Sequence, residues 1–505
     1  MSVDRSTAQQ IAARPNYDAG PEAQQITDSR QITARDGLYV GLRYGVGILI
    51  GLANMFVLTW WIGPHAYGLF VAAIGLSAFL GSLTRAGADT YLIRRQNTPD
   101  TRLYSVATTL ILATCSVLVL LGLAAVPALI HWYGSQEFAL PYAMTLITVP
   151  LTGVAGPPIA KLERELNFRN AAGIELAGQL LAFGVSALLA WRHFGVWAPI
   201  AGVIVSQTWV AIAAHVAAGL IPQLVWDFGE VRAMLSFGLG YTLSLRVWQL
   251  RGLVNPLLVG RLLGADAVAF VALAVRIAES LGFLRAVAGR LAIVGLSRMR
   301  GDRDRFRAAI QRGLELQVLA LGPLLCVFAA IAPIAVNRLF GARWALSLQV
   351  YPWIAAAIVI NSVFNLQASA LYVLGEQWTV LRAYCAHMVL FASGAYFLVS
   401  RVGLRGYGWA DLVACASYWL LHRTLGKHTH ISYRRVGAGC IAFGLPLFTH
   451  IVTSWWNWIL WLPFLLLLVL QLGAYSKRLK AEILPSERAD WFFKRSTRSL
   501  EASQP

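Results

Sequence analysis

The sequence predicts an all-α integral membrane protein with about 14 transmembrane helices, 12 being the alternative count. Of its 505 residues, 57% are hydrophobic and only 13% are charged, and the mean hydropathy is +0.60. Soluble domains carry about 25% charged residues, so this composition indicates a polytopic membrane protein. Apolar stretches of roughly 20 residues, the length that spans a bilayer, recur along most of the chain.

The order of these stretches predicts five regions. We expect a disordered polar tail without a signal peptide, an N-terminal six-helix bundle, a C-terminal six-helix bundle, an extra helix pair and a basic tail; these are 1–37, 38–221, 235–424, 435–475 and 476–505. The predicted spans are 38–61, 66–87, 106–132, 138–160, 171–193, 195–221, 235–260, 265–295, 313–340, 345–374, 378–401, 405–424, 435–454 and 456–475. Only a Trp-rich turn separates the last two spans, which is why 12 full crossings stay possible.

Lysine and arginine concentrate in both tails and in alternate connectors. The richest connectors are 94–102, 161–169, 298–312 and 423–435. By the positive-inside rule, this pattern places both termini in the cytoplasm and requires an even number of helices. The formal net charge of +18 therefore reflects membrane topology, and no nucleic-acid partner is expected.

Several arginines nevertheless fall inside the predicted spans. The candidates for an anion site are Arg246, Arg251 and Arg276, with Arg43, Arg285 and Arg290 as secondary candidates. An arginine at the centre of a spanning helix costs about 2.5–3.5 kcal/mol on insertion scales, so these side chains should face a cavity and not lipid. A guanidinium matches two phosphate oxygens at once, so such a cavity suits an anionic cargo.

Helical periodicity sorts these arginines. At about 100° per residue, Arg276, Glu279 and Arg290 share one face of the span 265–295, while Arg285 points elsewhere. Glu279 could neutralise charge or couple transport to an ion, and a local ion pair with Arg276 is the simpler alternative. In the preceding span, Asn255-Pro256 should kink the helix.

Two segments hint at an internal duplication. Asn54 precedes Gly63 in NMFVLTWWIG, and Asn255 precedes Gly264 in NPLLVGRLLG, with the same spacing in both. Two duplicated halves would place a binding site between them, as in many secondary transporters.

The sequence lacks the signatures of several enzyme classes. It contains no GxxxxGK[ST], GxSxG or HExxH motif, and its five cysteines show no CxxC spacing. We therefore expect no catalytic residues, no metal, no cofactor and no enzymatic activity.

Four segments carry a family resemblance: GPHAYGLFVAAIGLSAFLGSLTRAGADTYLIRR (63–95), LERELNFRNAAGIELAGQLLAFGVSALLAWRHFGVWAPIAG (162–202), LVGRLLGADAVAFVALAVRIAES (258–280) and LFGARWALSLQVYPWIA (339–355). In their order and spacing, they resemble the polysaccharide flippase family of the multidrug/oligosaccharidyl-lipid/polysaccharide exporter superfamily. The resemblance implies two pseudo-symmetric six-helix bundles around a central cavity, plus a C-terminal helix pair.

The same resemblance implies the cargo. It implies a flippase of the bacterial inner membrane that moves undecaprenyl-pyrophosphate-linked oligosaccharide repeat units by alternating access, for O-antigen, capsule or exopolysaccharide synthesis. Membrane lipids, a polysaccharide polymerase and export machinery are the implied partners, and the cavity arginines would hold the pyrophosphate. Two alternatives stay open: a multidrug or cation exporter of the same superfamily, and a membrane glycosyltransferase or polymerase.

Overall fold

The computed structural model describes residues 34–85, 87–95, 99–221, 223–299, 301–449, 459–467 and 469, and this part of the chain is helical without strands. The first half contains α3 (Ala34–Thr84), α4 (Ala88–Arg94), α5 (Thr101–Ala124), α6 (Val126–Tyr133), η1 (Gln136–Phe138), α7 (Ala139–Thr145), α8 (Thr148–Val154), α9 (Gly156–Arg164), α10 (Phe168–Trp191) and α11 (Trp197–Ala218). The central part contains α12 (Phe228–Gln249), α13 (Arg251–Val254), η2 (Asn255–Val259), α14 (Gly260–Leu263), α15 (Ala265–Leu281) and α16 (Phe283–Ser297). The last part contains α17 (Arg303–Leu339), η3 (Ala342–Gln349), α18 (Tyr351–Val373), α19 (Gln377–Val402), α20 (Arg405–Ala414), η4 (Cys415–Tyr418), α21 (Trp419–His428), α22 (Arg434–Gly444) and η5 (Leu445–Phe448).

Eight helical segments in the described part are long and apolar enough to cross a membrane. They are Gly45–Thr84, Thr101–Ala124, Gln136–Arg164, Phe168–Trp191, Trp197–Ala218, Arg303–Leu339, Tyr351–Val373 and Gln377–Val402. The chain is thus a multi-pass membrane protein, although the count of 14 spans is not established. Much of the predicted pair 435–475 lies outside the described residues.

The predicted spans 235–260, 265–295 and 405–424 are helical but interrupted. The predicted kink at Asn255-Pro256 is present as a π-helical turn, η2. Proline has no backbone N–H to donate, and the wider π-helical turn accommodates the missing hydrogen bond. Gly282 divides the next span into α15 and α16, and the 3₁₀ turn η4 separates α20 from α21.

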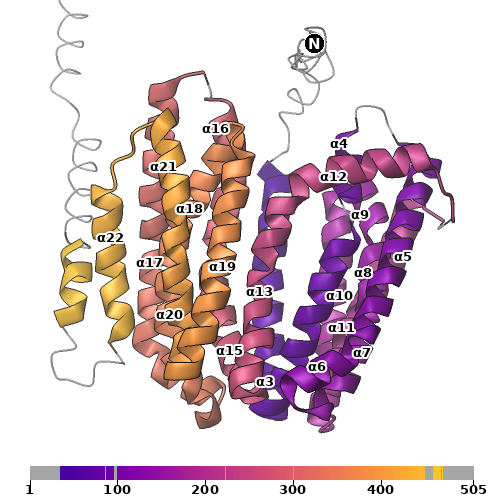
Figure 1. Cartoon of the computed structure of the whole chain (residues 1–505), viewed down its shortest axis with the longest axis horizontal. Coiled ribbons are helices and arrows are strands. Elements are labelled where there is room, and N and C mark those ends of the chain that lie inside the picture. Colours follow the sequence, from indigo (N-terminus) through magenta and orange to yellow (C-terminus); the bar gives the residue numbers. More distant parts are fainter. Residues whose placement is uncertain are drawn as a thin grey trace, which may run out of the picture.

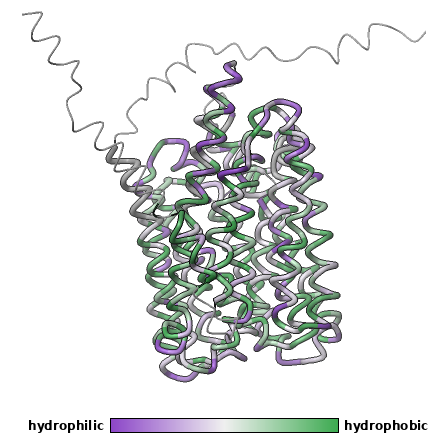
Figure 2. Tube along the Cα trace, turned by 90° about the vertical axis from the view of Figure 1, so that its left-hand side faces the viewer, coloured by the Kyte–Doolittle hydropathy of each residue, from purple (hydrophilic) through white to green (hydrophobic). Residues whose placement is uncertain are grey.

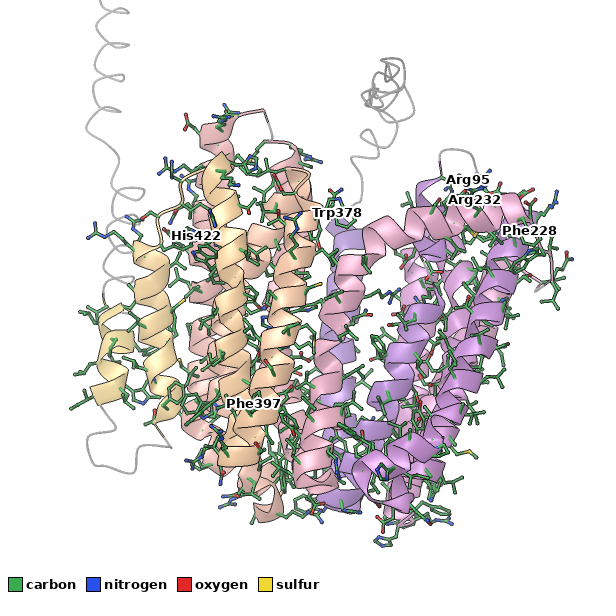
Figure 3. The ribbon with its side chains drawn as sticks, viewed as in Figure 1. Arg95, Phe228, Arg232, Trp378, Phe397 and His422 are labelled. Carbon is green, nitrogen blue, oxygen red and sulfur yellow. The ribbon has the colours of Figure 1, made fainter. Side chains whose placement is uncertain are left out.

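The helices run between two polar ends. In Figure 2, the middle of the bundle is mostly hydrophobic, and hydrophilic residues gather at its two ends. The helix α19 runs from one end towards the other, with Trp378 near its first end and Phe397 near its second end in Figure 3. Both aromatic side chains are exposed, as expected for residues that face lipid or its interface.

The helices form two groups, seen on either side of Figure 1. One core cluster comes mainly from α15 to α22 and includes Trp344, Phe391 and Tyr418; a second comes mainly from α3 to α12 and includes Phe138 and Leu146. The helix α3 contributes to both clusters, and the first part of α12 lies across one end of the group that contains α4 and α5 in Figure 1 before the chain turns into α13. The proposed domain boundaries themselves stay predictions.

The two glycines of the suspected duplication adopt the same backbone conformation. Gly63 has φ 75° and ψ 173°, and Gly264 has φ 86° and ψ −179°. Each lies between two consecutive helical stretches, and residues with a side chain rarely adopt such a positive φ. This match supports the internal duplication suggested by the sequence spacing.

Candidate functional site: a polar cavity between the helix groups

A cavity of about 530 Å³ lies between α3 and the helices that follow α11. Its walls come from α3, α12, α13, η2, α15 and α20. They include Asn54, Tyr67, Trp248, Gln249, Arg251, Asn255, Arg276, Glu279 and Tyr407. Charged groups of both signs therefore face a partly open space between the helices.

Two of these charges, Arg276 and Glu279, lie on the same face of α15, as the periodicity predicted. Both side chains are exposed, and within the described residues neither forms a hydrogen bond or an ion pair. The local ion pair between them, the simpler alternative from the sequence, is thus not formed. The Arg276 side chain packs against α3 at Gly51, where an added Cβ atom would lie 2.8 Å from the Nη2 atom of the arginine.

Arg251 has a partner of its own. Its Nη2 atom lies 2.5 Å from a carboxylate oxygen of Asp411 on α20, and the two side chains are 18% and 2% exposed. The His387 Nε2 atom lies 3.9 Å from the other oxygen of Asp411. The guanidinium also lies over the rings of Trp248 and Phe391. Arg251 is therefore a neutralised cation that joins α13 to α20, and it lines the cavity from that position.

Arg246 lies in a neighbouring cavity of about 320 Å³. There it shares the wall with Arg85 and Asp89, which form an ion pair at 3.3 Å. Arg246 donates to Oε1 of Gln249 at 3.1 Å and has no carboxylate partner among the described residues. Gln249 lines both cavities and lies between them.

The secondary candidates fall elsewhere. Arg285 donates to Oδ1 of Asn361 on α18 at 2.6 Å and does not line the main cavity. Arg290 belongs to α16 and Arg43 to α3, but both side chains lie outside the described part of the structure. The periodicity that put Arg290 on the face of Arg276 assumed one continuous helix, and the break at Gly282 removes that basis.

Two sets of hydrogen bonds join the helix groups near the Gly63 end of the cavity. Arg343 donates to the carbonyls of Thr59 and Trp60 on α3, and the Trp344 indole donates to Thr59 at 3.1 Å. In the opposite direction, Trp132 donates to Leu257 at 2.8 Å, and Tyr133 donates to Pro256 at 2.9 Å. In each set, side chains of one helix group donate hydrogen bonds to backbone carbonyls of the other group. We call these two sets of hydrogen bonds the reciprocal contacts.

An exposed histidine extends this link between the helix groups. His65 Nε2 lies 2.9 Å from Glu137, and Nδ1 lies 3.3 Å from Asp266. His65 follows Gly63 by the same spacing by which Asp266 follows Gly264, so equivalent positions of the two repeats meet here.

Sequence comparison matches the polysaccharide biosynthesis protein family over residues 57–349. A protein named as an O-antigen transporter from Shigella flexneri is 22% identical over 377 residues, which cover 72% of this chain and 90% of that protein. The succinoglycan biosynthesis transport protein ExoT of Rhizobium meliloti is 26% identical over 296 residues, 58% of each chain.

The fold also has a solved counterpart. The structure of the lipid II flippase MurJ in an inward closed conformation superposes with a TM-score of 0.69 at 12% identity, over 88% of this chain and 99% of that chain. The predicted membrane-transporter fold is thereby confirmed. Because the matched sequence profile extends over more than half of the sequence, the chain belongs to the polysaccharide biosynthesis protein family.

Proposed function

We propose that this protein is a flippase that moves undecaprenyl-pyrophosphate-linked oligosaccharide repeat units across the bacterial inner membrane. The observation that carries the proposal is the exposed guanidinium of Arg276 inside the cavity, which has no hydrogen-bond or ion-pair partner among the described residues. Its donors are therefore available to a pyrophosphate, which would accept charge-assisted hydrogen bonds from them. The names of the relatives, an O-antigen transporter and a succinoglycan transport protein, support this class of cargo.

Arg246 and Arg276, neither of which has a carboxylate partner among the described residues, define a route for the anion. Arg246 offers a first contact in the smaller cavity, and Gln249 leads to the main cavity, where Arg276 binds the pyrophosphate. Arg251 shapes the wall from its bond to Asp411 and contributes less attraction, since its charge is already neutralised. Glu279, one helical turn from Arg276, would weaken anion binding enough for release and remains the candidate for coupling.

Transport follows by alternating access. With the reciprocal contacts formed, the Gly63 end is held shut and the cavity is loaded from the opposite end, which carries the basic connectors. Opening towards the outer leaflet requires these contacts to break. Both termini would lie in the cytoplasm, in agreement with the distribution of basic residues.

No covalent chemistry is needed for this function. The cargo would come from the enzymes that assemble the lipid-linked repeat unit, and a polysaccharide polymerase and export machinery would use it on the outer side. These partners are the ones that the family resemblance implies.

A deletion strain tests the proposal. We expect it to lose surface polysaccharide, to accumulate lipid-linked repeat units in the inner leaflet and to recover with the wild-type gene. Complementation with Arg276→Ala should fail although the protein reaches the membrane at normal level. Unchanged export with Arg276→Ala, Arg246→Ala and the double variant would show that the arginines do not bind the cargo.

One observation favours the alternative of a cation exporter. Glu279 is an exposed carboxylate in the same cavity and, within the described residues, has no ion pair. A cation exporter would depend on this carboxylate, whereas the flippase depends on Arg276. Substituting each residue separately therefore distinguishes the two functions.

A further inference from the structure

A smaller pocket of about 270 Å³ opens beside Arg276, on the side of α10 and α11. It shares Gly51, Asn54 and Arg276 with the main cavity and is otherwise lined by residues of α3, α10 and α11. We call it the amide pocket, because Asn54, Gln179 and Gln207 line it together with Ser206.

Two glycines of α3 make room for this pocket. At Gly47, a Cβ atom would lie 3.1 Å from Oε1 of Gln179, and at Gly51 it would lie 2.8 Å from Nη2 of Arg276. The two glycines are one helical turn apart, so they share a face of α3. Their missing side chains let the amide of Gln179 and the guanidinium of Arg276 lie side by side against the helix.

The polar groups of the pocket keep hydrogen-bonding capacity unused. The Asn54 Oδ1 atom is buried without a partner, and the side chain of Gln179 has no hydrogen bond within the described residues. Gln207 accepts from the Thr152 hydroxyl through Oε1 at 3.2 Å, which leaves its NH₂ group to donate. The buried Asn54 oxygen is costly to leave unsatisfied, and the exposed Gln179 amide is accessible to a ligand, so the pocket is suited to a ligand that both donates and accepts.

The chemistry of these groups points to a sugar. Apart from Arg276 at its mouth, the residues that line the pocket are uncharged, which disfavours a second phosphate. An apolar prenyl chain could not satisfy the amides, whereas each sugar hydroxyl donates and accepts as amides do. Arg276 lines both the main cavity and the amide pocket. A sugar joined to a pyrophosphate that Arg276 binds would therefore lie next to the amide pocket.

We propose that the amide pocket binds the sugar attached directly to the pyrophosphate, and that Gln179 and Gln207 determine which sugar is accepted. This inference rests on the proposed function. It gives the two parts of the head group different partners: Arg276 holds the pyrophosphate, and the amides hold the first sugar.

The test compares two classes of lipid with the full-length protein in lipid nanodiscs. The probes are undecaprenyl pyrophosphate without sugar and the same lipid carrying one glucosyl, galactosyl or N-acetylglucosaminyl residue, with affinity measured by direct binding. Each lost neutral hydrogen bond weakens binding by about 3- to 10-fold, so Gln179→Leu with Gln207→Leu should weaken the preferred sugar lipid by about 10- to 100-fold. Affinity for the sugar-free lipid should stay unchanged.

Controls separate this effect from misfolding. Gln179→Leu alone removes a side chain without hydrogen bonds in the described structure, so it should fold normally and still weaken only the sugar lipid. Gln377→Leu makes the same change at an exposed site outside the pocket and should alter neither affinity. Arg276→Ala should weaken both lipids.

The outcomes distinguish the two proposals. If the glutamine variants weaken both lipids equally, or neither, the amide pocket does not bind the sugar, although the flippase function stands. If the wild-type protein binds neither class of lipid, the proposed function fails and this inference fails with it.

Discussion

The bond between Arg251 and Asp411 leads to a quantitative prediction. The two groups are 2.5 Å apart and only 18% and 2% exposed, so Asp411→Asn would leave a buried cation without its counter-charge. Removing one partner of a buried pair costs about 3–5 kcal/mol, compared with about 0–1 kcal/mol for an exposed pair. We therefore expect Asp411→Asn to lower the free energy of unfolding by about 3–5 kcal/mol, measured by denaturant titration of the protein in mixed micelles.

The matched control removes both charges. Replacing a buried ion pair with apolar side chains of similar size is often neutral or stabilising, so Arg251→Met with Asp411→Leu should recover most of the lost free energy. His387, 3.9 Å from Asp411, stays in both proteins. A loss below about 1 kcal/mol in Asp411→Asn, or a double variant less stable than the single one, would refute the view that this pair joins α13 to α20.

Three further changes test other parts of the structure. Gly68→Ala would place a Cβ atom 1.9 Å from the backbone carbonyl oxygen of Ala265. The free energy of unfolding should therefore fall by at least about 1–3 kcal/mol, and less folded protein should be found in the membrane. A normal amount of folded protein would contradict this helix contact. Glu279→Gln should strengthen binding of the anionic cargo and slow its release, so export of surface polysaccharide should fall without being lost; complete loss of export would instead favour a cation exporter or an essential coupling role. Arg343→Ala with Tyr133→Phe removes hydrogen bonds from both reciprocal contacts. A cysteine placed in the cavity should then react faster with a thiol reagent added from outside. An unchanged labelling rate would show that these contacts do not close the Gly63 end of the cavity.

Hydrophobicity made the fold class predictable. Apolar stretches of spanning length are required of any membrane helix, and the structure has helices at the predicted places throughout its described part. The interruptions were harder to predict. The proline of Asn255-Pro256 predicts a break in the helix, which the structure has as a π-helical turn. Gly282 gives no such signal, because many other glycines of this chain lie in unbroken helices.

The candidate site was predictable in part. The cost of a charge in the membrane singled out Arg276, and the helical period placed Glu279 on the same face; both side chains line the main cavity. The sequence could not show that Arg251 forms an ion pair whereas Arg276 does not within the described residues. The partner of Arg251, Asp411, is 160 residues away in the sequence. The amides Gln179 and Gln207 went unnoticed, since a neutral polar residue in a span gives only a weak signal. The small residues Gly47 and Gly51 on one face of α3 make room for Gln179 and Arg276, respectively.

In the proposed function, Arg276 binds the pyrophosphate of a lipid-linked sugar during translocation. The most direct measurement is the rate at which proteoliposomes containing the purified protein move a fluorescent undecaprenyl-pyrophosphate-linked oligosaccharide between leaflets. Charge-assisted hydrogen bonds contribute about 1.5–3 kcal/mol, so Arg276→Ala should lower this rate at limiting substrate by roughly 10- to 150-fold. Arg276→Lys should lie between the two, because lysine keeps the charge without the two-pronged geometry. Equal rates for wild-type protein and Arg276→Ala would contradict the account.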